Sequence, residues 1–375
     1  MSLSEPKSAS MFFMSVILNK YTEIFAWFSL RGTISTYNPW GIPYDQSSSI
    51  YAPQLSSSLR RFINLYPLAV INGVKAAWFG WKNKITAIYG DLSYESILSS
   101  RVASIILNVP LLSSIHDDPI NRLELKNYPK WIIKSYDKSL NKTLKMSKKI
   151  AVISDYMGEY YKMKYNVSTK TIFIGANVNS GVSQQGYKEK EKSKVFTIGS
   201  IGSIHCKYNW EKLAQSVKQL NNRSNHCKYK ILHIGKLPKS IKDKSFITDT
   251  GYIGEEQLPF YLQKMDIGFL NWSFSSKYNV TARTSFPLKI HSYLSENIPL
   301  MALGPEGSSI VRFVNDNNCG ISCTNNTVGD LREKIKLIST NKKIFNKYKN
   351  ESVKLSNKYS RQSFFKEFES FIKMN

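Results

Sequence analysis

Short apolar runs rich in β-branched residues alternate with helical patterns along most of the chain. In the first half these runs are EIFAWFSL (23–30), ITAIYG (85–90), PLLSSIHD (110–117), KKIAVIS (148–154) and KTIFIGANV (170–178). In the second half they are VFTIGSIG (195–202), YKILHIG (229–235), FITDTGYIG (246–254), DIGFLN (266–271), PLMALG (299–304) and GISCT (320–324). This alternation is typical of parallel strands joined by crossover helices. The pattern predicts an α/β protein built of two doubly wound halves.

The length of 375 residues suits two domains better than one. We place the first domain at residues 1–178 and the second at 195–355. The polar stretch between them, 179–194, carries two glycines and is predicted to be the linker. The C-terminal segment, 356–375, has a helical pattern and ends in apolar FFKEFESFI, so we expect it to pack back on the first domain.

The beginning of the chain departs from a doubly wound domain, which should open with a strand. Ser10 is a candidate N-cap for a helix over MFFMSVILNKY (11–21), yet no strand pattern precedes it. We therefore expect the first strand to be absent, or the true start to lie upstream.

The chain is strongly basic, with 52 Lys and Arg against 27 Asp and Glu and a formal charge of +25. Such a charge attracts nucleotides, nucleic acids or acidic lipids, although an AT-rich genome alone also yields lysine-rich proteins. No zinc finger, RRM signature or helix-turn-helix pattern is present, so we do not expect nucleic-acid binding.

The cysteines and the apolar runs narrow the classes of protein further. The four cysteines form no CxxC pair and have no nearby histidine cluster, which indicates reduced thiols in a cytosolic protein and no metal site. The longest apolar runs fall short of the ~20 residues that span a bilayer. Glu5, Pro6 and Lys7 precede the first of them, unlike a secretory signal.

Ligands of open α/β sheets bind outside the carboxyl ends of the strands. The residues that follow the strands of the second half include Gly202, Ser203, Lys207, Tyr252, Ile253 and Gly307. Glycines and helix starts at such turns favour a phosphate group, although a glycine after a strand is often a simple turn residue. Three turns of this kind in one half predict a site for a phosphorylated ligand.

The segment SFPLKIHSYLSENIP (285–299) predicts a turn followed by an amphipathic helix. Ser285 is a candidate cap for that helix, and Lys289 lies in its first turn.

The order of these motifs resembles the nucleotide-sugar glycosyltransferases of the GT-B fold, most of all the retaining family 4 of bacterial surface-polysaccharide synthesis. The resemblance rests on IAVISDYMGEYY, FTIGSIG, GYIGEEQLPFYLQKMDIGFLNW and SFPLKIHSYLSENIPLMALGPEGSSIV, and it spans residues 84–337. It implies two Rossmann-like domains facing a cleft, a nucleotide sugar held by the second domain and an acceptor held by the first. It also implies no metal, because basic residues and helix starts neutralise the leaving diphosphate.

The resemblance assigns roles to residues of the second half. Lys289 and Lys207 would contact the diphosphate, Gly202 would approach it, and Tyr252 and Ile253 would border the base. Many family members carry glutamates eight residues apart where this chain has Thr284 and Ser292. A hydroxyl still hydrogen-bonds a sugar but offers no anionic acceptor. Ser285 to Lys289 matches transferases with an SFPxK turn that rely on that lysine.

In the first half, LLSSIHDDP resembles the strand-end histidine segment of these transferases, which puts His116 near the transferred sugar. A histidine that only hydrogen-bonds the strand end is the alternative. Asp91 ends a similar strand, where a solvated turn acid explains it equally well. An inverting enzyme would need a base, for which His116, Asp91 and Asp117 are the candidates.

Five lysines repeat every fourth residue from Lys126 to Lys142 and include Lys130, Lys134 and Lys138. A helix that begins after Pro129 would align them opposite an apolar face. A solvated helix face is the ordinary explanation, and contact with acidic lipid is the functional one. Arg60 and Arg61 begin a second basic stretch, which is rich in tryptophan.

The sequence thus predicts a cytoplasmic glycosyltransferase, peripheral on the inner face of the membrane. It would transfer a sugar with retention from a nucleotide diphosphate to a lipid-linked or growing glycan in surface-polysaccharide synthesis, as in lipopolysaccharide. The alternatives are an inverting GT-B transferase and a degenerate binding partner that Thr284 and Ser292 would leave inactive. An epimerase or phosphorylase is less consistent with the residues present.

Overall fold

The computed structural model describes residues 27–28, 44–45, 62–63, 66–93, 96–173, 175, 195–204, 206–224, 227–237, 241 and 245–373. The predicted helix at 11–21 with Ser10, the predicted linker at 179–194 and the residues Arg60 and Arg61 lie outside this range. Contacts within the chain divide it into two compact units, one formed by Met1–Ile172 with Glu369–Asn375 and the other by Phe173–Phe368.

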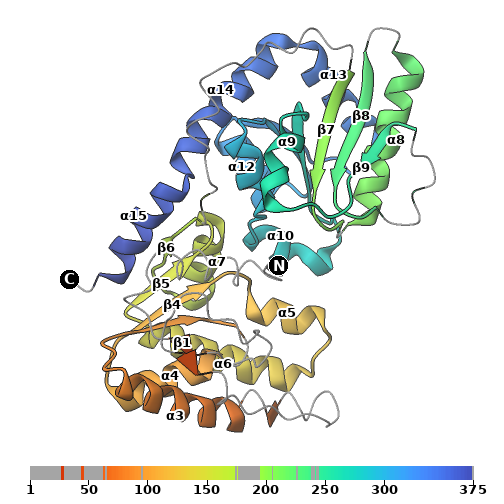
Figure 1. The fold of residues 1–375 in the computed structure, drawn as a ribbon. Coiled ribbons are helices and arrows are strands. Elements are labelled where there is room, and N and C mark those ends of the chain that lie inside the picture. The colour runs from red at the N-terminus through yellow and green to blue at the C-terminus, as the bar shows by residue number, and fades with distance from the viewer. Residues whose placement is uncertain are drawn as a thin grey trace. The chain divides into compact units, whose positions relative to one another are not determined.

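The first unit contains a four-stranded parallel sheet of order β3-β4-β5-β6 and a two-stranded sheet of β1 and β2 (Figure 1). Its strands are β1 (Trp27–Phe28), β2 (Tyr44–Asp45), β3 (Ile88–Asp91), β4 (Leu111–Ile115), β5 (Lys149–Val152) and β6 (Lys170–Thr171). Its helices are α3 (Pro67–Lys82), α4 (Ser96–Leu107), α5 (Pro119–Leu125), α6 (Lys130–Met146) and α7 (Asp155–Tyr165). Four of the five strand runs expected here contain a strand of this sheet, and β1 lies in the fifth. The pair β1–β2 was not expected.

The second unit contains a six-stranded parallel sheet of order β9-β8-β7-β10-β11-β12. Its strands are β7 (Val195–Ile201), β8 (Lys228–Ile234), β9 (Ile247–Asp249), β10 (Ile267–Asn271), β11 (Leu300–Leu303) and β12 (Gly320–Cys323). The chain therefore winds outward from β7 in one direction and from β10 in the other. The two central strands form a topological switch point, where ligands of such sheets bind.

Helices and short 3-10 turns connect these strands (Figure 1). They are α8 (Lys207–Arg223), η1 (Glu255–Gln257), α9 (Leu258–Leu262), η2 (Ser276–Tyr278), α10 (Asn279–Thr284), α11 (Lys289–Ser295), α12 (Ser309–Asp316), α13 (Val328–Thr340), α14 (Lys342–Lys358) and α15 (Arg361–Ile372). The core of this unit is built from alternate residues of β7, β8 and β10 packed against α8 and α13, with Trp210 fully buried.

The last turn of α15 contacts the sheet of the first unit, to which Glu369–Asn375 belong. Lys149 Nζ donates hydrogen bonds to the carbonyls of Phe371, at 3.0 Å, and Lys373, at 2.6 Å. The Phe371 ring is buried and lies edge-on to Tyr89, 6.4 Å between centroids. The apolar end of the sequence thus has a buried environment.

Glycines inside the second sheet act by making room for large side chains. A Cβ at Gly199 would lie 2.0 Å from Met265 Sδ, and one at Gly268 would lie 2.5 Å from the Tyr293 ring. The Tyr293 ring is fully buried, and its hydroxyl donates to the Gly199 carbonyl at 3.2 Å. Gly199, within β7, therefore serves packing inside the sheet.

Candidate functional site

The carboxyl end of β7 turns into α8 through Gly202, whose φ is +77°. No atom lies within 4 Å of the position that a Cβ would take at Gly202, so the backbone is open on that side. Ser203 and Lys207 follow it and are exposed, and Lys207 is the first residue of α8. No side chain caps that helix. Its first amides and the Lys207 ammonium are together suited to an anion.

Two contacts join the strand-to-helix turns of the second unit at this edge of the sheet, and a third joins α11 to β7 inside the sheet. Asn209 of α8 is buried, and its Nδ2 donates to the carbonyl of Trp272, after β10, at 2.7 Å. Ser309, the first residue of α12, donates its hydroxyl to the Ser285 carbonyl. Tyr293 of α11 reaches the carbonyl of Gly199 in β7. The turns after β7, β10 and β11 therefore form one connected surface.

Lys289 is the first residue of α11, as its spacing from the preceding turn indicated. Burial of its ammonium lowers the pKa of Lys289 to about 8, well below that of a free lysine. Burial lowers the pKa of His233, a residue near the end of β8, and the charge of Lys289 lowers it further. A bound anion would stabilise the Lys289 ammonium in these surroundings.

Ser285 ends α10 and does not cap α11, which corrects the predicted role of its side chain. The residue before α11 is Leu288, which contributes no side-chain cap, and Ser285 N donates to the Thr281 carbonyl at 2.9 Å. Pro287 has a fixed φ and separates the two helices. The helix consequently begins three residues later than a cap at Ser285 would set.

Thr284 and Ser292 differ in position, although both stand where glutamates were expected. Thr284 is fully buried and donates its hydroxyl to the Val280 carbonyl at 2.8 Å, within α10. Ser292 lies three residues after Lys289 on α11 and is half-buried, while its neighbours His291 and Tyr293 are buried. Residues three apart share a helix face, so Ser292 accompanies Lys289.

The turn after β11 offers a second open helix start. Gly307 is exposed, and Ser308 precedes α12 without capping it by a side-chain hydrogen bond. The Ser308 hydroxyl is buried and has no hydrogen-bond partner among the residues that the structure describes. A buried hydroxyl without a partner is costly, so this one is suited to a ligand at the start of α12.

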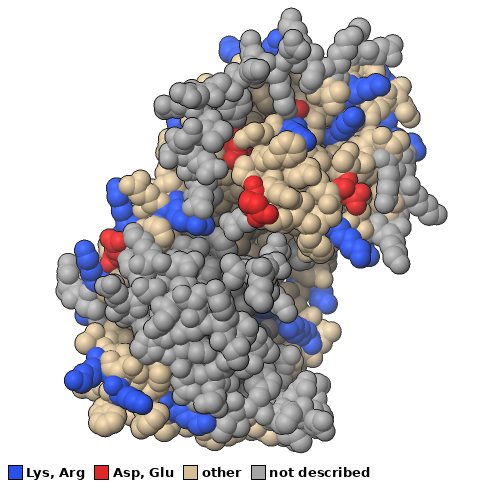
Figure 2. Space-filling view, viewed as in Figure 1, with Lys and Arg blue, Asp and Glu red and all other residues tan. Residues whose placement is uncertain are grey.

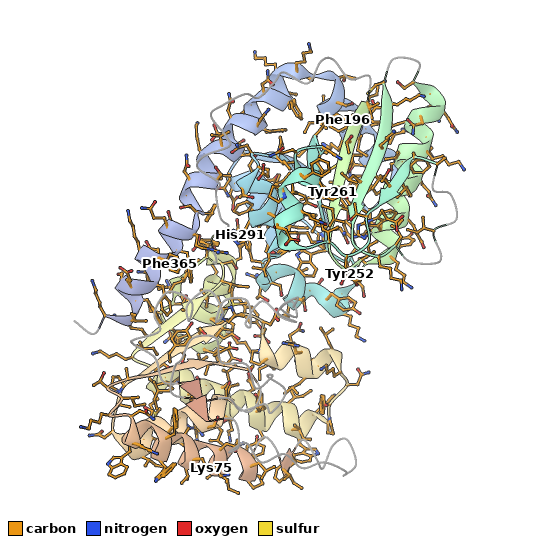
Figure 3. All side chains as sticks on the ribbon, in the orientation of Figure 1. Lys75, Phe196, Tyr252, Tyr261, His291 and Phe365 are labelled. Carbon is orange, nitrogen blue, oxygen red and sulfur yellow. The ribbon has the colours of Figure 1, made fainter. Side chains whose placement is uncertain are left out.

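Tyr252 and Ile253 follow β9, which lies at the edge of the sheet. Tyr252 is 74% exposed and is labelled in Figure 3, and Ile253 is half-buried. An exposed aromatic ring beside the end of a sheet is suited to stacking on a flat ligand. Gly251, directly before Tyr252, has a φ of 68°, and Gly235, directly after β8, has a φ of 142°. These two glycines form an isolated β-bridge.

Two polar residues of this edge were not singled out from the sequence. His233 is fully buried, and its Nδ1 lies 3.2 Å from the Ser200 hydroxyl. Asn209 holds the loop after β10, as described above. The sequence contained a signal for His233, because this histidine lies near the end of the strand run YKILHIG. A histidine at the end of a strand was the same signal that singled out His116 in the first half.

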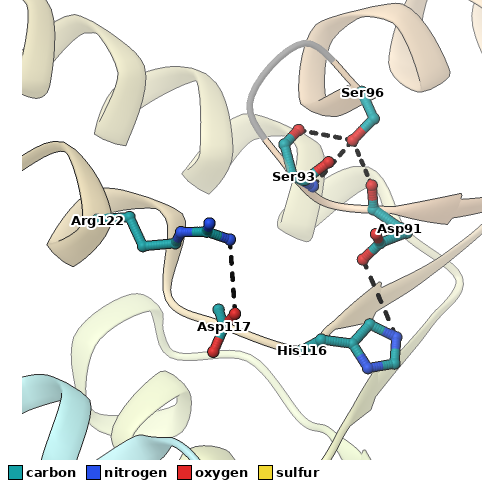
Figure 4. A network of polar contacts seen from close by, with 6 residues as sticks. All are labelled: Asp91, Ser93, Ser96, His116, Asp117 and Arg122. Atoms are coloured by element: carbon teal, nitrogen blue, oxygen red, sulfur yellow. Dashed lines mark hydrogen bonds and ion pairs between the residues drawn. The ribbon is translucent and has the colours of Figure 1, made fainter. Parts of the chain in front are cut away.

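In the first unit, His116 and Asp91 stand at the ends of the neighbouring strands β4 and β3 (Figure 4). His116 Nε2 lies 4.0 Å from Asp91 Oδ1, a distance at which the charges interact without a hydrogen bond. Burial lowers the pKa of His116, and the carboxylates of Asp91 and Asp117 partly oppose that change. The imidazole is therefore neutral at pH 7 and able to accept a proton.

Asp117 and Asp118 follow His116 but point elsewhere. Asp117 is exposed and pairs with Arg122 at 3.5 Å, as Figure 4 shows. Asp118 is buried, caps α5 by accepting from Asn121 N at 2.6 Å, and accepts from the Tyr161 hydroxyl at 3.0 Å. Burial raises the pKa of Asp118. Of the three candidates in this unit, the structure brings His116 and Asp91 together and directs Asp117 toward Arg122.

The lysine-rich segment forms α6, which begins at Lys130 directly after Pro129, as predicted. Its buried residues include Ile132, Tyr136, Leu140 and Leu144, while Lys130, Lys134 and Lys138 are exposed. The predicted separation of a basic face from an apolar face is confirmed.

The described residues contain no group of three or more His, Cys, Asp or Glu placed to hold a metal ion. None of their helices is both long enough and apolar enough to cross a bilayer.

The fold can be compared with solved structures, although no protein-family model and no curated protein sequence matches the chain. A glycosyltransferase from Rickettsia africae aligns over 92% of this chain and 88% of its own, with 17% identity and a TM-score of 0.65. Anabaena HepE, solved with UDP and glucose, aligns over 98% of both chains at 13% identity and a TM-score of 0.64. Sucrose-phosphate synthase from Thermosynechococcus elongatus aligns over 97% of this chain and 92% of its own, with 11% identity and a TM-score of 0.67. The chain therefore has the GT-B fold, two Rossmann-like α/β units that glycosyltransferases share.

Proposed function

We propose that this protein is a glycosyltransferase whose donor is a nucleoside-diphosphate sugar held by the second unit. The observation that carries the proposal is the connected edge of the β7–β12 sheet. There two uncapped helix starts, an open Gly202 and the desolvated ammonium of Lys289 adjoin the switch point. A diphosphate supplies the negative charge that such an edge lacks.

Lys289 and Lys207 would hold the diphosphate, with Gly202 and Gly307 allowing the backbone to approach it. Tyr252 and Ile253 would border the base, and Ser292 would face the ribose from the same helix face as Lys289. Thr284 has its hydroxyl bonded inside α10, so it would shape the site through packing. The solved HepE complex with UDP and glucose supports a uridine nucleotide as the first donor to test.

In the transfer, the bond between the sugar C1 and the diphosphate oxygen breaks and a bond from C1 to an acceptor oxygen forms. The acceptor proton passes to the leaving phosphate in a retaining reaction, which the resemblance to family 4 supports. His116, neutral at pH 7 and beside Asp91, would contact the transferred sugar. In an inverting reaction the same imidazole would take the acceptor proton.

The acceptor we propose is a lipid-linked or growing glycan of surface-polysaccharide synthesis, reached at the inner face of the cytoplasmic membrane. The formal charge of +25 and the exposed lysine face of α6 support attraction to an anionic bilayer.

A thermal-shift screen of nucleoside diphosphates and their sugars tests the proposal directly. A ligand present at 100 times its Kd raises the free energy of unfolding by about 2.7 kcal/mol, a shift of several degrees in Tm. Stabilisation by one nucleotide and its sugars is the expected outcome, and the anomeric configuration of the product, read by NMR, then separates retention from inversion. Absence of stabilisation by every nucleotide would overturn the proposal.

One alternative is supported by a specific observation, the hydroxyls at the two positions where glutamates were expected. A protein with this site could bind a nucleotide sugar without turning it over. Nucleotide binding without donor hydrolysis or transfer, across donors and acceptors, would favour that function.

A further inference from the structure

Helix α3 buries mainly small residues, with Phe79 the exception, and exposes several large apolar side chains. The buried residues of α3 are Ala69, Asn72, Gly73, Ala77, Phe79 and Gly80. Its exposed large apolar residues are Val70, Ile71, Val74, Trp78 and Trp81. Trp78 is 59% and Trp81 is 71% exposed. An amphipathic helix on a soluble protein normally buries its large apolar residues, so this exposed stripe needs another explanation.

The small face lies close against α4. A Cβ at Gly73 would lie 2.7 Å from Val102 Cβ, and one at Gly80 would lie 2.8 Å from Leu107 Cδ1. Both pairs are separated by 27 to 29 residues, so the two helices run parallel and in register. The close packing fixes the direction of α3 and leaves its other face outward.

That register extends the apolar stripe onto α4. With Gly80 beside Leu107, the residues Ile105 and Ile106 lie level with the turn of α3 that carries Trp78 and Trp81. Ile105 is 63% and Ile106 is 53% exposed. Two parallel, adjacent helices therefore both carry exposed apolar side chains, and we name these residues together the α3–α4 face: Val70, Ile71, Val74, Trp78, Trp81, Ile105 and Ile106.

The charged residues of helices α3 and α4 themselves are all basic. Helices α3 and α4 contain no Asp or Glu, and they carry Lys75, Lys82 and Arg101. Lys82 Nζ lies 5.7 Å from the centroid of the Trp78 ring, so the cation and the ring are presented together. Figure 2 shows Lys and Arg side chains along the lower edge of this unit, and Figure 3 labels Lys75 there.

We propose that the α3–α4 face inserts its tryptophans and isoleucines into the surface of an anionic lipid bilayer. Tryptophan is favoured at the boundary between headgroups and acyl chains, and lysines beside it pair with acidic headgroups. Charge complementarity selects this occupant over a second copy of the chain, because two copies of helices that carry only basic charge repel each other. The proposal rests on the membrane location in the proposed function and deepens it, since it assigns the inserting residues to α3 and α4 beside the attraction that α6 provides.

Co-sedimentation with vesicles tests the face, with the purified full-length protein and no donor or acceptor present. We expect binding to vesicles of about 30% phosphatidylglycerol in phosphatidylcholine. Binding to vesicles of phosphatidylcholine alone should be at least about tenfold weaker. The variant Trp78→Ser with Trp81→Ser should weaken binding to the anionic vesicles about tenfold or more. Lys75→Gln with Lys82→Gln should reduce it by a similar factor and flatten its salt dependence.

Matched control variants distinguish vesicle binding by this face from nonspecific binding through any exposed aromatic ring or lysine. Phe260→Ser removes a ring of the second unit that is 59% exposed, and Lys343→Gln with Lys347→Gln removes two exposed lysines of α14. Both should leave vesicle binding within about twofold. Quenching of tryptophan fluorescence by brominated lipid should occur in the wild type and fall in Trp78→Phe with Trp81→Phe, a change that preserves the apolar rings.

Three results would overturn the proposal. They are unchanged vesicle binding in the serine variant, equal binding to neutral and anionic vesicles, and no binding together with a dimer that the serine variant abolishes. Nucleotide binding is measured separately, without vesicles, in every variant. Loss of vesicle binding with intact nucleotide binding concerns this face alone, whereas a wild type that binds vesicles and no nucleotide overturns only the proposed function.

Discussion

His116 Nε2 lies 4.0 Å from Asp91 Oδ1, although 25 residues separate them in the chain. Strands β3 and β4 are parallel neighbours, so their carboxyl ends bring the two side chains to one edge. The carboxylate is not close enough for a hydrogen bond, and it acts on the imidazole through its charge.

Asp91→Asn should therefore change the pH dependence of His116. Burial holds the pKa of His116 below its ordinary value, and the Asp91 carboxylate partly opposes this change. Removing that charge lowers the pKa further, so protonation of His116 should begin at a lower pH. If neutral His116 takes part in transfer, the acid limb of the kcat/KM profile moves to lower pH in the variant. An NMR titration of the imidazole measures the same change without activity, and an upward shift would contradict the assignment.

Lys289→Ala and Ser292→Ala should separate charge from hydrogen bonding at the donor. A charge-assisted hydrogen bond contributes about 1.5–3 kcal/mol and a neutral one about 1 kcal/mol. We expect Lys289→Ala to weaken nucleoside-diphosphate binding by about 10- to 100-fold and Ser292→Ala by less than about tenfold, measured by calorimetry. Lys264→Ala is a control, since that lysine lies over the Phe260 ring on α9. Equal losses in both site variants would remove the special role of Lys289.

Donor affinity should fall as pH rises through the pKa of Lys289, about 8 in the free protein. A bound diphosphate favours the ammonium and raises this pKa, so binding above pH 8 takes up a proton. Each further pH unit should weaken binding by up to about tenfold until the pKa of the complex is reached. Calorimetry at pH 8.5 in buffers of different ionisation enthalpy reports the uptake. The slope should disappear in Lys289→Ala, and a slope that persists there would assign it to another group.

The lowered pKa of Lys289 also makes the stability of the folded protein depend on pH. Because the pKa of Lys289 is lower in the folded protein than in the unfolded one, protonation disfavours folding below about pH 8. The unfolded chain binds more protons between about 8 and the ordinary lysine pKa, so stability from this residue rises with pH across that window. Urea titrations at pH 7.5 and 9.5 should show a smaller rise for Lys289→Met than for the wild type.

Gly268→Ala and Gly329→Ala should have opposite effects on stability. The Cβ at Gly268 would lie 2.5 Å from the Tyr293 ring, which is buried and held by a hydrogen bond. We expect a loss of about 1–3 kcal/mol in the free energy of unfolding. Gly329 lies in the first turn of α13 with nothing within 4 Å of its Cβ position, so alanine should stabilise the protein by up to about 1 kcal/mol. Chemical denaturation measures both.

The sequence alone determined the periodic features of this protein. Apolar runs of five to nine residues marked the strands from β3 to β12, because buried parallel strands are apolar on both faces. Pro129 marked the start of α6, because a proline is not tolerated in the interior of a helix. The lysines at every fourth position marked its outward face, because side chains four residues apart share a helix face. The position of Lys289 at the start of a helix after the SFP turn was likewise readable.

The tertiary structure decided what depends on neighbours far away in the chain. Asp117 and Asp91 were equal candidates by position, and only the strand pairing put Asp91 beside His116 while Arg122 engaged Asp117. Gly199 became a packing position because Met265 fills the space over it, and Thr284 became part of a helix interior. The sequence suggested an interfacial surface in the tryptophan-rich basic stretch, but only the packing decided which side of α3 faces outward. Gly73 and Gly80 bring α4 against the small side of the helix, which leaves Trp78 and Trp81 on the surface.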